Sequence, residues 1–281
     1  MTPGGQGTIA SAVTLDGVGL HTGRAVRATL RPATENAGIV FRRTDRPGPA
    51  IPATLGSVSG TTGCLALGGP DGLSTVEHLL SAAASLGVDN LTVDVDGPEF
   101  PGLDGSALPI VRALRRAGAR TLAAPRRSLE VREPVWVHDG DAWAAALPAP
   151  ALQAVYVVTL SPPALGDQAA TYAARHATYE ETIAPARTWG YARDASALRA
   201  KGMALGASYD NTLVIGDGGF LNTPRFPNEA ARHKLLDLLG DLALLRHPIC
   251  GRVVVVRGGH RLHVALARAL APLAPSGEQG G

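Results

Sequence analysis

The sequence predicts an α+β fold with two domains, each a β-sheet covered by helices on one face. Both halves of the chain mix short strand-like segments with helices, and neither shows the regular β-α-β alternation of a parallel sheet. The chain has 281 residues, enough for two domains of ordinary size. The stretch 122–128 has the composition of a linker, so we expect domains at 1–123 and 128–275. The halves show no residue-level repeat.

The first half contains short alternating strands and helices with clear boundary residues. Strands are expected at 25–31, 38–42 and 90–96, and helices at 75–85 and 108–117. Ser74 is a candidate to open the first helix, Ser106 the second, and Gly118 follows the second helix as a typical end signal. The chain ends, 1–10 and 275–281, are expected to fray.

The second half repeats this mixture of elements after the linker. Strands are expected at 129–137, 142–146, 153–160, 212–215 and 253–256, and helices at 196–201, 228–245 and 263–270. The valine run 253–256 is continuously apolar, which predicts a buried strand. The helix at 228–245 is the longest expected helix, and it also carries the polar pattern that indicates a function.

Composition excludes several classes of protein. The hydrophobic fraction is 45%, the charged fraction 18% and the net charge +2, which describes a globular protein with too little positive charge to favour nucleic-acid binding. Cys64 and Cys250 lie far apart, which argues against a disulfide framework and a thiolate zinc site. Neither a signal peptide nor an apolar run of about 20 residues is evident, so we expect a cytoplasmic monomer without stable membrane insertion.

The segment 229–241 places a possible metal-binding pattern on a helix. His233 and Asp237 are one turn apart and separated by about 40° around the helix axis, so an imidazole nitrogen and a carboxylate oxygen can converge on one divalent ion. Such a ligand pair suits zinc. Asp241 lies a further turn along, about 80° from His233, and can reach the rim of the same site. A solvent-facing polar stripe on an amphipathic helix would also explain this spacing.

A second candidate site lies at Glu77-His78. Ser74 and Glu77 fit a capping box, which would explain Glu77 but not His78. An adjacent Glu-His pair can supply one metal ligand and one general base, as in metallohydrolases. Together with His233 and Asp237, His78 would complete a set of two histidines and one aspartate with an open fourth position.

Two further segments could carry catalytic groups. His260 follows two glycines after the valine strand, and Asp241 could fix its tautomer and raise its pKa, which would make His260 a cation able to protonate a leaving amine. A surface-loop histidine is the alternative. Thr188 and Trp189 could form a sugar-binding wall with an oxyanion donor, but the residues alone favour a turn-forming threonine beside a buried tryptophan.

Seven segments of the chain resemble one enzyme family, in order from about residue 8 to 270. They are 17–23, 74–81, 104–107, 184–190, 208–211, 232–241 and 259–260. The family is that of UDP-3-O-acyl-N-acetylglucosamine deacetylase. The resemblance implies a zinc amidase with two similarly folded α+β domains, each a sheet packed against two helices, and an active site between them. The implied reaction removes acetate from UDP-3-O-(3-hydroxyacyl)-N-acetylglucosamine in lipid A biosynthesis.

The resemblance also implies roles for individual residues of the metal site. His78, His233 and Asp237 would be the zinc ligands, although such a set also accepts ferrous iron. Glu77 would be the general base that takes a proton from water, and His260 the general acid.

Other positions match residues around the substrate. Asp241 would orient the general acid, Thr188 would support the oxyanion, and Trp189 occupies the position of a phenylalanine that packs on the glucosamine ring. The positions implied near the phosphates and sugar are Lys234, His21 and Arg257, the last replacing a lysine.

The segment 191–207 has smaller side chains than the family usually has at three positions. Alanines stand at Ala192, Ala195 and Ala207, where bulkier apolar residues often line a tunnel for the acyl chain. A deacetylase acting on a non-acylated N-acetyl amino-sugar nucleotide is therefore an alternative. A non-enzymatic zinc- or nucleotide-binding protein is another, but it would need neither the proposed base nor the proposed acid.

Overall fold

A computed structural model describes residues 4–163, 165–174 and 176–275. The first half forms a five-stranded sheet of order β2-β3-β9-β4-β5. Its strands are β2 (Val13–Val18), β3 (Ala25–Pro32), β9 (Leu91–Val95), β4 (Ile39–Arg43) and β5 (Ile51–Pro52). Strand β9, the last in sequence, lies in the centre, antiparallel to β3 and parallel to β4.

The second half builds a sheet of the same topology, β12-β13-β20-β14-β15. Its strands are β12 (Val135–Asp139), β13 (Ala142–Leu147), β20 (Arg252–Val256), β14 (Gln153–Thr159) and β15 (Asp167–Ala173). Strand β20 is again central, antiparallel to β13 and parallel to β14. The two halves therefore share strand order and pairing sense, which confirms the predicted α+β fold although their sequences show no repeat.

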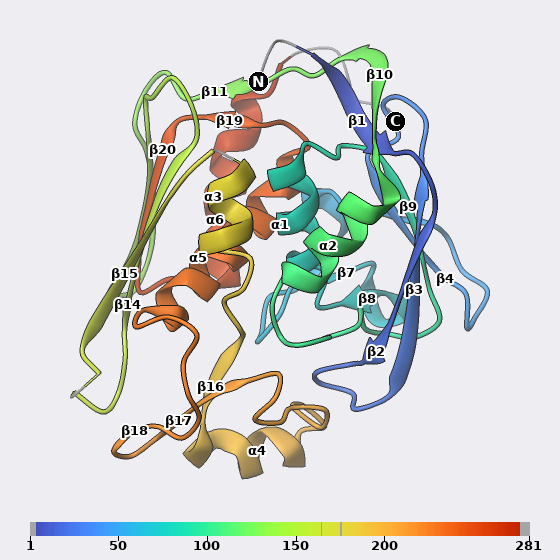
Figure 1. The fold of residues 1–281 in the computed structure, drawn as a ribbon. Helices are drawn as coiled ribbons and strands as arrows, with labels where there is room; N and C mark the ends of the chain where they lie inside the picture. The colour runs from blue at the N-terminus through green and yellow to red at the C-terminus, as the bar shows by residue number, and fades with distance from the viewer. Residues whose placement is uncertain (1–3, 164, 175, 276–281) are drawn as a thin grey trace.

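Each half adds a helix before and a helix after its central strand. The helices are α1 (Glu77–Leu86) and α2 (Leu108–Ala117) in the first half, and α5 (Glu229–Leu242) and α6 (His260–Leu270) in the second. Figure 1 shows the two sheets on opposite sides of the molecule with these helices between them. Helices α1 and α5 pack against each other in the middle, and α5 also contacts β14 and β15. The helical layer thus covers the inner face of both sheets.

Close packing of α1 on α5 depends on a glycine. A Cβ atom added to Gly240 would lie 2.2 Å from the carbonyl oxygen of Glu77, a distance that real Cβ atoms do not reach. Only glycine, which lacks a Cβ, lets the two backbones approach this closely. The close approach brings the start of α1 beside the polar residues of α5.

The inner faces of the sheets carry the core. In β20, Val253 and Val255 are fully buried, whereas Val254 and Val256 are only partly buried. The expected buried strand therefore forms, but its full burial is confined to one face, because helices cover this sheet on one face only.

A separate small sheet follows α3 (His176–Thr182) and lies at the bottom of Figure 1. It contains β16 (Trp189–Tyr191), β17 (Leu213–Gly216) and β18 (Gly219–Phe220), and α4 (Ala195–Ala200) connects its first two strands. The predicted helix at 196–201 and strand at 212–215 are confirmed. Three short strands, β6 (Val58–Gly60), β7 (Ala66–Leu67) and β8 (Leu73–Ser74), form another sheet before α1.

The N-terminal segment differs from expectation. Strand β1 (Gly5–Ile9) pairs antiparallel with β10 (Ala119–Pro125), so the prediction of fraying over the first ten residues is wrong for this part. Ile9 is fully buried and the Thr8 hydroxyl donates to the Asn90 carbonyl at 2.7 Å, which anchors the strand. Strand β10 also occupies the start of the expected linker. The segments 1–3 and 276–281 lie outside the described residues.

The expected strand at 129–137 is interrupted. Strand β11 (Leu129–Glu130) pairs in parallel with β19 (Ile249–Cys250), and β12 begins only after Pro134. Proline lacks the N–H that a continuous strand would use, which accounts for the break. Strands β2 and β15 were not among the expected strands.

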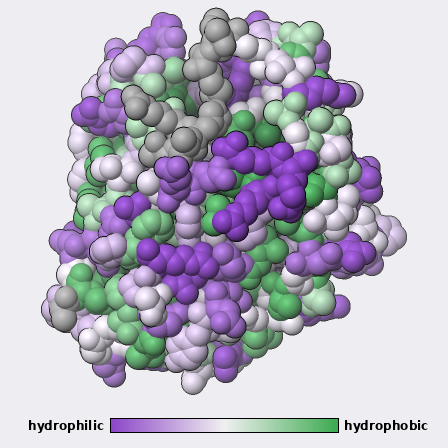
Figure 2. Space-filling model, viewed as in Figure 1, coloured by the Kyte–Doolittle hydropathy of each residue, from purple (hydrophilic) through white to green (hydrophobic). Residues whose placement is uncertain are grey.

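Hydrophilic residues run in bands over the face seen in Figure 2, with smaller hydrophobic groups between them. Among the described residues, no helix combines the length and the apolar character needed to cross a bilayer.

Candidate active site

The structure brings together the three predicted metal ligands from two helices. His78 comes from α1, and His233 and Asp237 come from successive turns of α5. The Asp237 Oδ1 atom lies 3.3 Å from His233 Nε2 and 3.8 Å from His78 Nε2. All three side chains are buried, and their ligand atoms lie within 4.8 Å of one another. The polar pattern on α5 is therefore not a solvent-facing stripe.

Protonation states favour metal binding. Burial lowers the pKa of both imidazoles, that of His78 to about 3 with help from the neighbouring His233, so both rings are neutral. His233 Nδ1 lies 3.1 Å from the Ala186 carbonyl oxygen and must donate to it, which leaves Nε2 free to accept. Burial alone would raise the pKa of Asp237, but the positive charges of Lys234 and His260 hold it well below its usual range.

One oxygen of this site lacks a partner. Asp237 Oδ1 is buried and accepts no hydrogen bond from any described residue, whereas Oδ2 accepts one from Lys234 Nζ at 2.9 Å. A buried carboxylate oxygen without a donor is costly unless something else compensates it. Two neutral imidazole nitrogens and this oxygen fit a divalent cation with N/O preference.

Glu77 lies beside the ligands, but not as a helix cap. It is the first residue of α1, and Ser74 instead lies in β8 and donates to the Pro98 carbonyl, so the predicted capping box is wrong. Glu77 Oε2 accepts a hydrogen bond from the Leu65 N–H at 3.2 Å. Burial raises the pKa of Glu77 to about 8, although the positive charge of His260 opposes this. In its ionised form, a carboxylate with a raised pKa is a stronger base than an ordinary glutamate.

His260 faces Glu77 from the opposite side of the site. It is the first residue of α6 rather than a loop residue, because the helix begins three residues earlier than expected. Its Nε2 lies 3.8 Å from Glu77 Oε1, and its Nδ1 donates to Asp241 Oδ2 at 2.8 Å. Burial alone would lower the pKa of His260, but Asp241, with Asp237 and Glu77, raises it to about 9. The ring is therefore a cation at neutral pH, as predicted.

Asp241 has a second histidine partner that the sequence analysis missed. His263 Nδ1 also lies 2.8 Å from Asp241 Oδ2, and its Nε2 lies 2.9 Å from the Tyr156 hydroxyl oxygen. His263 and Tyr156 are fully buried. The spacing of three residues after His260 could have indicated that His263 shares its helix face. Tyr156 belongs to β14, and no local pattern connects it to this site.

A cavity of about 190 Å³ opens onto the metal-ligand set, Glu77 and His260. Four other predicted residues also line it: His21, Thr188, Trp189 and Lys234. Buried polar atoms of His21 (Nε2) and Trp189 (Nε1) have no hydrogen-bond partner among the described residues. Such atoms are available to a polar ligand.

Two predicted residues lie outside the cavity lining. Asp241 is fully buried behind His260. Arg257 is exposed, and its guanidinium donates to the Asp141 carbonyl at 3.1 Å.

Glu99 is a further residue that sequence reasoning did not find. This buried carboxylate accepts hydrogen bonds from the His21 N–H at 2.8 Å and from the Thr75 hydroxyl at 3.0 Å. Thr75 precedes α1 and has a φ of 59°, a conformation that non-glycine residues rarely adopt. Glu99 thus holds both the loop of His21 and the approach to Glu77.

Comparisons with known proteins find relatives along nearly the whole chain. A family model described as UDP-3-O-acyl N-acetylglycosamine deacetylase (LpxC) matches residues 6–272. Proteins named UDP-3-O-acyl-N-acetylglucosamine deacetylase are similar over most of both chains. One from Photobacterium profundum is 41% identical over 94% of this chain and 90% of its own length. Those from Thermosynechococcus vestitus and Phenylobacterium zucineum are 43% and 44% identical, each over 95% of this chain and 94% and 93% of their own lengths.

Proposed function

The chain belongs to the UDP-3-O-acyl N-acetylglycosamine deacetylase family, and from this we propose its reaction. The enzyme hydrolyses the N-acetyl group of UDP-3-O-(3-hydroxyacyl)-N-acetylglucosamine and releases acetate, in lipid A biosynthesis. One observation carries this proposal: a buried set of two histidines and one aspartate shares a cavity with a carboxylate and a cationic histidine. A protein that only bound zinc or a nucleotide would need neither of the last two groups.

The metal that we propose is zinc, held by His78, His233 and Asp237. Ferrous iron suits the same donor set. When bound, a divalent cation would act as a Lewis acid on the amide carbonyl. Such an ion typically stabilises the charge of the transition state by about several kcal/mol. The remaining steps fall to side chains of the chain itself.

Amide hydrolysis needs one proton removed from water and one delivered to the leaving nitrogen. Glu77 accepts the proton of the attacking water, since its raised pKa makes it a competent base. As the C–N bond breaks, cationic His260 donates a proton to the amine, and Asp241 keeps that imidazole oriented. The Thr188 hydroxyl donates to the developing oxyanion. The products are acetate and the free amino sugar.

Binding of the sugar nucleotide is assigned to the other lining residues. Trp189 packs on the glucosamine ring, and Lys234 and His21 contact the sugar and phosphates. Lys234 Nζ lies 6.0 Å from the centre of the Trp189 ring, so both can act on one ligand. Arg257, which is outside the cavity lining, would contact the diphosphate. The domain limits, the cytoplasmic location and the monomeric state stay predictions.

Names of the relatives include the 3-O-acyl group, which favours an acylated substrate over the non-acylated alternative. We expect turnover of acylated UDP-N-acetylglucosamine to exceed that of the unacylated sugar nucleotide by at least about tenfold, because even a few buried methylenes are worth that much. The measurement is acetate release by metal-reconstituted protein over a series of acyl lengths. Equal turnover of both substrates would support the alternative.

The alkaline limb of the pH profile should report His260. Its pKa is raised to about 9, so the proton donor is present below this pH and is lost as the pH rises through it. In Asp241→Asn the neighbouring negative charge is removed, and the limb of kcat/KM should move to lower pH by about 1–3 pH units. Profiles of kcat/KM for wild type and variant test this. An unchanged limb in the variant would assign it to another group.

A further inference from the structure

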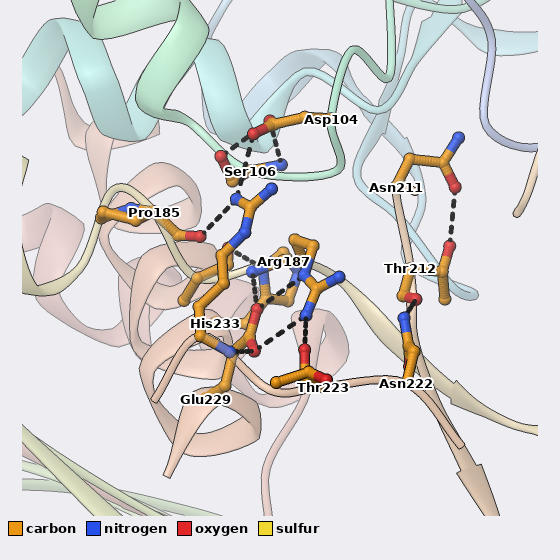
Figure 3. Close-up of polar contacts among 12 residues, drawn as sticks. Asp104, Ser106, Pro185, Arg187, Asn211, Thr212, Asn222, Thr223, Glu229 and His233 are labelled. Carbon is orange, nitrogen blue, oxygen red and sulfur yellow. Dashed lines mark hydrogen bonds and ion pairs between the residues drawn. The ribbon is translucent and has the colours of Figure 1, made fainter. Parts of the chain in front are cut away.

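A buried ion pair connects the segment before Thr188 to the start of α5. Arg187 is 6% exposed and Glu229 is fully buried. The Arg187 backbone N–H and Nε each donate to Glu229 Oε1 at 2.9 Å, and Nη2 donates to Oε2 at 3.3 Å. The Thr223 carbonyl accepts another hydrogen bond from Nη2 at 2.8 Å. Figure 3 shows the two side chains facing each other, with Thr223 beside them.

The same face of α5 also holds the neighbouring residue of that segment. His233 follows Glu229 by one helical turn, and its Nδ1 bonds the Ala186 carbonyl at 3.1 Å. Residues 186 and 187 are therefore fixed to α5 at two successive turns. The Ala186 carbonyl is the group that selects the tautomer of His233. Any shift of Arg187 would move this carbonyl relative to the ring.

Two backbone hydrogen bonds position Thr188. Its N–H donates to the Gly105 carbonyl at 2.8 Å, and its carbonyl accepts from the Leu213 N–H at 2.8 Å. Arg225 adds a connection to the first half of the chain, because its Nη1 donates to the Pro185 carbonyl at 2.7 Å and lies 3.0 Å from Asp104 Oδ2. Its own N–H donates to Glu229 Oε2.

We propose that Arg187 and Glu229 are positioning residues that set two parts of the site at once: the imidazole of His233 and the hydroxyl of Thr188. The ion pair holds a three-residue segment whose first carbonyl orients a metal ligand and whose last side chain lines the cavity. Neither residue touches the cavity itself. The pair therefore couples metal affinity to oxyanion stabilisation, and this inference rests on the proposed function only for the second of these.

Metal affinity tests the first part without any substrate. Glu229→Gln places an amide NH₂ against N–H donors and so removes part of the ion pair with Arg187. Zinc affinity should then fall about 10–100-fold, which competition with a chelating dye measures. The matched control is Asp89→Asn, which breaks another Arg–carboxylate pair: Asp89 accepts from Arg126 Nε at 2.8 Å and from the Gly7 N–H at 2.7 Å. Asp89→Asn should bind zinc as wild type does. Equal affinities in Glu229→Gln and wild type, or equal losses in both variants, would overturn the inference.

Double substitution tests the second part. If Glu229 acts on turnover through Thr188, the effect of Glu229→Gln should depend on that threonine. With saturating zinc, Glu229→Gln as a single substitution should lower kcat about 10–100-fold, and added to Thr188→Val it should lower kcat much less. Additive losses in kcat would overturn this part. Should Glu229→Gln fail to fold, Arg187→Lys replaces it, since lysine keeps the charge and loses the forked donors. Absence of deacetylation in wild type would contradict the proposed function and leave the zinc measurement valid.

Discussion

Glu77→Gln should lower kcat by about 10²–10⁴-fold, the usual contribution of a general base, while the protein keeps its full metal content. Glutamine has nearly the size of glutamate and can still accept the hydrogen bond from the Leu65 N–H, so the fold should be unchanged. It cannot take a proton from water. Because the proposed ligands are His78, His233 and Asp237, a substitution of Glu77 should separate the two effects. Acetate release and metal analysis on the same preparation measure them.

Glu77→Ala serves as the second variant in this experiment. It removes the carboxylate together with the Leu65 contact, so it should lose as much turnover and also some stability. Near-normal turnover in either variant, with metal bound, would show that another group activates the water.

Asp237→Asn should abolish tight metal binding and with it the activity. The carboxylate supplies the anionic ligand atom, and its Oδ1 is the buried oxygen without a hydrogen-bond donor among the described residues. For wild type, zinc at 100 times its Kd should stabilise the fold by about 2.7 kcal/mol. In the variant, added zinc should leave the melting temperature almost unchanged. Thermal unfolding with and without a chelator measures both.

Asp241→Asn is the matched control for this variant. Asp241 is equally buried on the same helix, but it bonds His260 and His263 instead of completing the ligand set. Its zinc-dependent rise in melting temperature should equal that of wild type, although its pH profile changes. Normal zinc stabilisation of Asp237→Asn would remove Asp237 from the ligand set.

Elements with a strong local period were predictable. The helix predicted at 228–245 forms as α5 followed by a short 3-10 turn, Ala243–Leu245. It is predictable because its apolar residues recur at helical spacing. Strands without alternation, such as β1, were not predictable. Gly5–Ile9 becomes a strand only because β10 is available to pair with it. The same reason explains why a strand took the place of part of the expected linker.

The sequence by itself determined which residues could share one helix face. Local spacing in a helix decides the direction in which side chains point, because the helix repeats every 3.6 residues. The pairs His233 and Asp237, and Glu77 and His78, have this local kind of spacing. The family resemblance added the expected roles of these residues, and the comparisons show the family.

Only the tertiary structure decided which of these faces meet. The close approach of α1 and α5 at Gly240, the second histidine on Asp241 and the Arg187–Glu229 pair join segments from 22 to more than 100 residues apart. Such contacts depend on how sheets and helices pack, and a chain's local periodicity contains no information on packing partners. Local patterns alone did not reveal the shared topology of the two halves, because different side chains can fill equivalent positions in a sheet.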